Sequence, residues 1–283
     1  MIIDGHHHLW DPARRAYPWL VGPGLQPLRR RYHLGDLRAA LPAEVGATVL
    51  VQTVSDRAET AEFLATAAGS AGLIAGVVGW VDLTAPDVAD QIAELRAGPG
   101  GDRLVGVRHQ VQDEPDPRWL LRPAVLRGLR AVAAAGLRYD LLVTTPQLPA
   151  ALTATEAVPR LEFVLDHLAK PPIAADGWQP WAAGLAALAS RPNVTAKVSG
   201  LVTEDHWRQV DPGRLRRYAD LAWACFGPDR LMFGSDWPVC TLVTGYAQVL
   251  AVAGELAAGL SPAERSAFFA GTAQRVYRLA IDR

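Results

Sequence analysis

Short, nearly continuous apolar runs alternate along the chain with longer segments rich in alanine, leucine and arginine. The short runs, such as residues 48–51 and 77–80, have the composition of strands buried on both faces, and the longer segments have the apolar spacing of helices. We predict eight strands, at residues 1–4, 47–53, 74–81, 104–111, 137–143, 161–167, 194–199 and 230–235. Helical patterns lie between them, at residues 58–68, 88–96, 123–135, 178–190 and 214–225. This alternation is typical of an α/β protein whose parallel strands close into a single (β/α)₈ barrel, the TIM barrel.

The two ends of the chain depart from this alternation. Residues 246–258 and 262–279 have the pattern of two closing helices, and Ser261 followed by Glu264 is a capping-box signal for the second. Residues 10–46 hold five prolines and two tryptophans but no clear strand, so we expect a long loop that forms a lid or substrate wall above the barrel. No segment resembles a linker, and we predict one domain over residues 1–283.

The composition of the chain argues against nucleic acid and membranes as binding partners. A formal net charge of -1 and a pI near 6.7 give no basic surface for nucleic acid, and no apolar run is long enough to span a membrane. Two cysteines cannot build a disulfide framework. We therefore expect a cytoplasmic protein with a small-molecule partner, and a homo-oligomer is compatible with the sequence.

The basic residues are biased toward arginine. Lys170 and Lys197 are the only lysines among 28 lysine and arginine residues. This bias predicts that the two lysines occupy places where a guanidinium would not fit, although chance retention explains either one alone equally well.

Unusual polar and aromatic side chains gather where the predicted strands end. In a TIM barrel these carboxyl ends carry the chemistry. Each buried polar group would cost about 1–3 kcal/mol if it were unpaired, so their convergence predicts one shared polar site. The set is His6, His8, Gln52, Trp80, Asp82, Arg108, His109, Gln110, Tyr139, Asp140, Asp166, His167, Lys197, Ser199, Ser235, Asp236 and Trp237.

A metal site is the chemistry that this set favours. His6 and His8 lie two apart in a strand and should point to one side, whereas His7 should point to the other. Joined by His167 and Asp236, they offer three imidazoles and one carboxylate, which suit one divalent ion, with zinc the best match. Taken singly, His167 and Asp236 could equally be structural caps.

Six segments, spread nearly from end to end, carry a family resemblance: IIDGHHHLW (2–10), YPWL (17–20), GVRHQ (106–110), DLLV (140–143), VLDHLAKP (164–171) and MFGSDWP (232–238). In this order they resemble the amidohydrolase superfamily, and within it the sugar-lactonase branch of L-fuconolactonase-like and L-rhamnonolactonase-like enzymes. The resemblance implies a distorted (β/α)₈ barrel that carries His6 and His8 on strand one, His167 on strand six and Asp236 on strand eight.

The resemblance also limits the metal content. Many superfamily members bridge two metals with a carbamylated lysine at the end of strand four, where this chain has Val107, Arg108 and His109. A binuclear site is therefore not expected. Some members of the branch work with one metal and others with none, so the ligand set leaves metal-independent catalysis open.

Lactone hydrolysis needs a nucleophilic water, a polarised carbonyl and a proton for the leaving alkoxide. We predict Asp236 as the general base, with a zinc ion on His6, His8 and His167. His109 is predicted to donate to the developing oxyanion.

The predicted substrate contacts come from other strand ends and from tryptophans. Arg108 or Lys197 would add positive charge or bind hydroxyl groups, and Gln52 would complete the polar contacts. Tryptophans are expected to form apolar walls against the sugar ring, although each could instead be packing: Trp10, Trp19, Trp80 and Trp237.

Three other functions remain open on the sequence. A metal-dependent decarboxylase could use the same residue set, and hydrolysis of an aromatic-pathway lactone, such as a muconolactone or pyrone dicarboxylate, would need more cations in the pocket. A catalytically silent binding protein is the third. The intact Asp236 argues against it, because loss of the base is the simplest route to silence.

Overall fold

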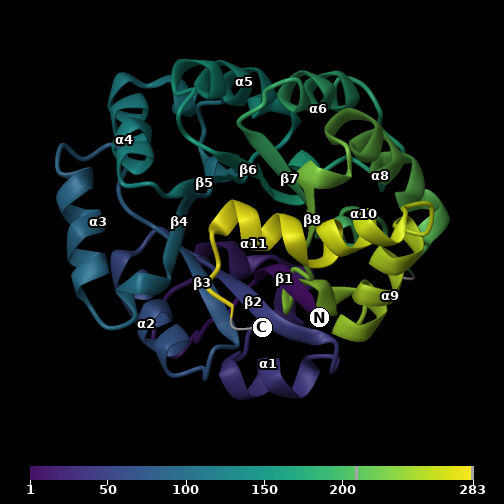
Figure 1. The fold of residues 1–283 in the computed structure, drawn as a ribbon, viewed down its shortest axis with the longest axis horizontal. Coiled ribbons are helices and arrows are strands. Elements are labelled where there is room, and N and C mark those ends of the chain that lie inside the picture. Colours follow the sequence, from purple (N-terminus) through teal and green to yellow (C-terminus); the bar gives the residue numbers. More distant parts are fainter. Residues whose placement is uncertain (208–209, 282–283) are drawn as a thin grey trace.

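The computed structural model describes residues 1–207 and 210–281 and contains one sheet of eight parallel strands in the order of the sequence. Helices surround this sheet (Figure 1), which confirms the predicted (β/α)₈ barrel. The strands are β1 (Ile2–His7), β2 (Val45–Val51), β3 (Ile74–Gly79), β4 (Leu104–His109), β5 (Arg138–Leu141), β6 (Phe163–Leu165), β7 (Val194–Val198) and β8 (Leu231–Phe233). All eight predicted strands are present, several of them shorter than expected.

The barrel closes between β1 and the segment that follows β8. The backbone N–H of Asp236 donates to His6 O at 2.8 Å, and that of His8 donates to Trp237 O at 2.7 Å. The buried Asp4 carboxylate ties the same junction, because it accepts hydrogen bonds from the Ser235 N–H and hydroxyl at 2.8 and 2.6 Å. This closure brings together the first and last segments that carry predicted site residues.

The helices follow the predicted pattern with three additions. The segments at 34–40, 148–157 and 201–204 are helical although the apolar spacing did not single them out; the second contains a proline and two threonines, and the third is four residues long. The helices are α1 (Leu34–Ala40), α2 (Arg57–Ala68), α3 (Val88–Ala97), α4 (Pro123–Ala134), α5 (Leu148–Ala157), α6 (Trp181–Ala189), α7 (Leu201–Glu204), α8 (Pro212–Phe226), α9 (Tyr246–Leu256), α10 (Pro262–Ser266) and α11 (Thr272–Tyr277). None of the described helices is both long and apolar enough to span a bilayer.

The C-terminal helices cross the end of the barrel where the strands begin (Figure 1). The predicted capping box is present, because Ser261 N–H donates to Glu264 and the Ser261 hydroxyl accepts from the Glu264 N–H. A π-helical turn at 267–271 divides the predicted single helix into α10 and α11. Tyr277 reaches from α11 into the barrel and donates a hydrogen bond to Asp140. This contact connects the C-terminal helix to the buried polar residues inside the barrel.

The segment at residues 10–46 is an ordered wall. It contains two 3₁₀ helices, at 18–21 and 23–28, followed by α1. Trp10 packs edge-on against Trp19 and Tyr32 with ring centres 5.1 and 5.0 Å apart. The Trp19 indole donates to Thr53 O at 2.9 Å, which fixes this wall to the end of β2.

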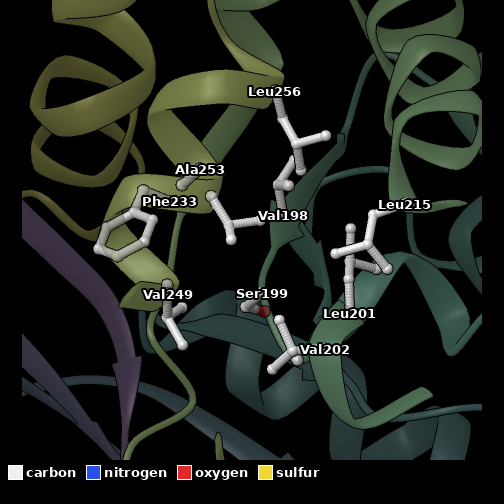
Figure 2. Close-up of a pocket in the computed structure, with 12 residues that line it drawn as sticks. Val198, Ser199, Leu201, Val202, Leu215, Phe233, Val249, Ala253 and Leu256 are labelled. Atoms are coloured by element: carbon white, nitrogen blue, oxygen red, sulfur yellow. The ribbon is translucent and has the colours of Figure 1, made fainter. Parts of the chain in front are cut away.

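The described residues leave a small gap in the packing on the outer side of the barrel. Apolar side chains from β7 and β8 and from α8 and α9 surround a small cavity (Figure 2), and its lining includes Val198, Leu215, Phe233, Val249 and Leu256. Its free volume of about 20 Å³ is enough for one water molecule. This cavity is too small for a ligand, and its lining includes Ser199, whose hydroxyl also contacts His167.

Candidate functional site

The predicted metal ligands meet at the carboxyl end of the barrel. Oδ1 of Asp236 lies 3.4 Å from His8 Nε2, 3.8 Å from His6 Nε2 and 4.0 Å from His167 Nε2. The two Nε2 atoms of His6 and His8 are 3.1 Å apart. Ligands of a tetrahedral zinc ion, with bonds of about 2.0–2.1 Å, are separated by roughly 3.3 Å. The separations match that value closely enough for these side chains to hold a divalent metal ion.

The rings are oriented by the other nitrogen of each histidine. Nδ1 of His8 lies 2.8 Å from Val51 O, and Nδ1 of His167 lies 2.8 Å from the Ser199 hydroxyl. Nδ1 of His6 lies 3.3 Å from Asp166. The carbonyl partner on Nδ1 of His8 leaves its Nε2 lone pair directed at the common centre, as in other histidine metal sites.

Burial keeps these imidazoles neutral. It lowers the pKa of His6 well below its usual value, with the nearby Lys197 charge adding to the effect, and it also lowers the pKa of His8. The pKa of His167 falls to about 4, again mainly through burial. Neutral imidazoles are the form that binds a metal. In contrast, His7 points away and contacts the Thr48 hydroxyl at 3.0 Å, as the strand alternation predicts.

Asp236 is ionised within this group. Burial alone would raise the pKa of its carboxyl, but the neighbouring His167 and His8 and the positive charge of Lys170 bring it below the usual value. Its backbone has a φ of 55°, a left-handed conformation that is uncommon for a residue with a side chain. The contact with His6 O holds that conformation and aims the carboxylate at the imidazoles.

A strained turn presents His167. Four consecutive non-glycine residues at 167–170 have φ between 50° and 59°, a conformation that costs about 1–2 kcal/mol for each residue. The Trp181 indole holds the turn by donating to Leu168 O at 2.7 Å. Gly200 leaves room for it, because a Cβ there would lie 2.7 Å from His167 Nδ1. The turn directs His167 and Lys170 toward the same pocket.

A buried charge network lies beneath His6. Lys197 is fully buried, and its ammonium lies 2.6 Å from Asp140, 3.0 Å from Asp166 and 3.0 Å from His6 Nδ1. Arg108 lies 2.9 Å from Asp166. Burial would raise the pKa of Asp166, but Lys197 and the other cations hold it well below its usual range, whereas burial raises that of Asp140 to about 6 despite Lys197. Lys197 and Asp166 of this network contact Nδ1 of His6 and so hold its ring in place.

A pocket of about 110 Å³ opens above Asp236. Its lining combines imidazoles, a carboxylate, two cations, apolar side chains and uncharged polar side chains: His8, Trp19, Thr53, Arg108, Gln110, Gln112, Leu142, His167, Lys170, Asp236 and Val239. Two members of the predicted substrate-contact set, Arg108 and Trp19, belong to this lining. Gln52 lies behind Arg108 and accepts a hydrogen bond from the guanidinium at 3.1 Å.

Other predicted contact residues lie outside the pocket. His109 is on the opposite face of β4 from Arg108, because adjacent strand residues alternate. Its Nδ1 accepts from the Trp80 indole at 3.0 Å, its Nε2 lies 2.7 Å from Glu114, and its ring stacks on Trp119. The structure thus brings Trp80 and His109 together, but away from Asp236.

The tryptophans divide in the same way. Trp10 and Trp237 are 3% exposed and both pack against Tyr32, behind the pocket wall. Trp19 lines the pocket itself. Sequence reasoning assigned no site role to Lys170, although one signal was present, since it is one of two lysines in an arginine-rich chain.

The family follows from comparison with known proteins. A family model described as amidohydrolase matches residues 3–279. The chain belongs to the amidohydrolase family. This confirms the superfamily resemblance that the six sequence segments indicated.

Relatives within this family cover nearly the whole chain. The L-fucono-1,5-lactonase of Burkholderia multivorans is 41% identical, over 98% of this chain and 96% of its own length. That of Burkholderia ambifaria is 36% identical, over 99% and 96%. A crystal structure of a Burkholderia multivorans amidohydrolase with bound zinc is 40% identical, covers 99% of this chain and 100% of that chain, and has a TM-score of 0.91.

Proposed function

We propose that this amidohydrolase opens the ester ring of a neutral sugar lactone, of the L-fucono-1,5-lactone kind, to the sugar acid. The observation that carries the proposal is an ionised Asp236 facing three neutral imidazoles, in a pocket whose cations are already paired with carboxylates. The names of the 41% and 36% identical relatives support the same substrate class.

The charge balance of the pocket separates this substrate from acidic alternatives. Among the described lining residues, the guanidinium of Arg108 is paired with Asp166 and the ammonium of Lys170 lies 3.7 Å from Glu204. A pyrone dicarboxylate or an aromatic acid would need a cation free for its carboxylate. The uncharged Thr53, Gln110 and Gln112 suit hydroxyl groups instead.

The chain's own residues can perform the hydrolysis. Asp236 accepts a proton from the attacking water and later passes it to the leaving alkoxide. Arg108, whose Nη1 lies 3.4 Å from His6 Nε2, contributes positive charge that stabilises the oxyanion. It takes the place that the sequence assigned to His109, because His109 lies on the other face of β4 and does not line the pocket.

The donor set fits one divalent ion. His6, His167 and Asp236 lie close enough to one another to hold it, His8 would add a further imidazole 3.4 Å from Asp236, and we propose zinc because imidazole and carboxylate ligands suit it. When bound, the ion supplies positive charge that polarises the lactone carbonyl and lowers the pKa of water.

The test is a panel of aldonolactones and unsaturated aromatic acids, followed for acid and for carbon dioxide. We expect L-fucono-1,5-lactone, or a stereochemical relative of it, to release one proton for each ring opened. Carbon dioxide from an aromatic acid, with no acid from any lactone, would refute the proposal in favour of a decarboxylase. Repeating the assay after chelation measures how far the activity depends on the metal.

A further inference from the structure

The two long-chain cations of the pocket lining differ in how they are held. The Arg108 side chain is 3% exposed and is hydrogen-bonded to Gln52 and Asp166. The Lys170 side chain is 27% exposed, and its ion-pair partner among the described residues, Glu204 Oε1, is 3.7 Å from Nζ. This distance exceeds the usual hydrogen-bond range of about 2.7–3.2 Å. Lys170 therefore keeps hydrogen-bonding capacity that Arg108 has already used.

Lys170 also stands beside the reacting groups. It follows His167 on the left-handed turn, and both side chains line the pocket together with Asp236. Glu204, the last residue of α7, is 24% exposed and does not belong to the described lining. A ligand above Asp236 would thus meet the ammonium, while the carboxylate stays behind it.

We propose that Lys170 donates hydrogen bonds to the ring hydroxyl groups of the sugar lactone, and that Glu204 positions it. This inference rests on the proposed function and assigns a specificity-determining residue to it. Lys170 is the substrate contact, and Glu204 acts through Lys170.

The chemistry of the pair selects hydroxyl groups over a carboxylate. Glu204 cancels the net charge of the ammonium but leaves its donors available. A hydroxyl accepts from the ammonium, and it can donate to a neighbouring carboxylate or amide oxygen at the same time. A substrate carboxylate would instead compete with Glu204 and meet the negative charge of Asp236.

The experiment pairs side-chain deletion with hydroxyl deletion. Wild-type enzyme and Lys170→Met are assayed on L-fucono-1,5-lactone and on lactones that each lack one ring hydroxyl. We expect Lys170→Met to lower kcat/KM roughly 10- to 100-fold on the full lactone, mainly by raising KM, as for a lost charged hydrogen bond. For the lactone without the contacted hydroxyl, the two enzymes should differ by less than about threefold.

Two further variants separate contact from mere structure. Glu204→Gln keeps the size of the side chain but leaves the ammonium uncompensated. It should weaken binding of the neutral lactone several-fold and strengthen inhibition by the sugar-acid anion. A loss of structure would weaken the binding of both ligands, so these opposite changes in affinity would exclude it. Arg191→Met, which removes a half-exposed cation 3.0 Å from Glu156 outside the pocket, is the matched control and should keep wild-type values.

The outcomes are distinguishable. An equal loss on every lactone, unchanged kinetics of Lys170→Met, or a fall in kcat at constant KM would each overturn the assignment of Lys170. Absence of lactone turnover by the wild-type enzyme would overturn the proposed function and this inference together. Turnover of lactones without coupling to any hydroxyl would overturn only this inference.

Discussion

Asp236→Asn tests the centre of the proposed reaction. Asparagine has nearly the same size, and the backbone hydrogen bond from residue 236 to His6 O would remain, so the barrel closure is kept. The carboxylate charge and the proton acceptor are lost. Because a positioned general base contributes about 10²–10⁴ in rate, we expect kcat to fall at least about 10²-fold.

The structure predicts a much smaller effect on stability. Oδ1 of Asp236 lies 3.4 Å or more from each imidazole nitrogen, so the carboxylate makes no short hydrogen bond there. An amide also costs less to bury than a carboxylate. We expect unfolding free energy to change by less than about 1 kcal/mol, or roughly 2–4 °C in Tm, against at least about 2.7 kcal/mol in the activation barrier.

The assay is proton release from L-fucono-1,5-lactone, with thermal unfolding and metal content measured on the same samples. Asp82→Asn is the matched control. Asp82 caps its own loop by accepting from the Thr84 N–H and hydroxyl at 2.9 and 2.6 Å, and it is absent from the described pocket lining, so the variant should turn over lactone at the wild-type rate. If Asp236→Asn remained within about tenfold of wild type while folded, the role of general base would be refuted.

Three further predictions address the metal, a buried acid and the core. His6→Ala and His8→Ala should lose metal while His7→Ala retains it, measured as metal per folded protein; the reverse result would contradict the strand register. Burial raises the pKa of Glu59 to about 7, so the folded protein binds the extra proton and stability should fall as pH rises from about 4.5 through 7. In urea unfolding, the stability difference between the wild type and Glu59→Gln should therefore change by about 3 kcal/mol over this pH range. Leu215→Ala, which enlarges the cavity of Figure 2, should cost about 2–5 kcal/mol in unfolding free energy, and a loss below 1 kcal/mol would mean that the site collapses.

The pattern of apolar runs was enough to predict the barrel and its polar end. Buried parallel strands have a composition that is legible in the sequence, and the carboxyl ends of such strands meet at one face whatever their exact register. For this reason the order of residues along the chain is sufficient to group His6, His8, His167 and Asp236. The helices at 34–40 and 148–157 lack a clear apolar spacing in the sequence, and they are stabilised by packing against the barrel instead.

Tertiary structure decided which neighbours of these residues face the pocket. Arg108 and His109 are adjacent in sequence, and only the register of β4 in the sheet turns Arg108 inward and His109 toward Trp80. Trp19 reaches the pocket because of the path of a long loop, which no periodicity encodes. Lys170 does so through a left-handed turn held by Trp181. The sequence alone determined which histidines and which carboxylate meet, since strand ends converge by topology. The proposed substrate contacts depend on side-chain direction, which packing fixes only when the barrel is closed.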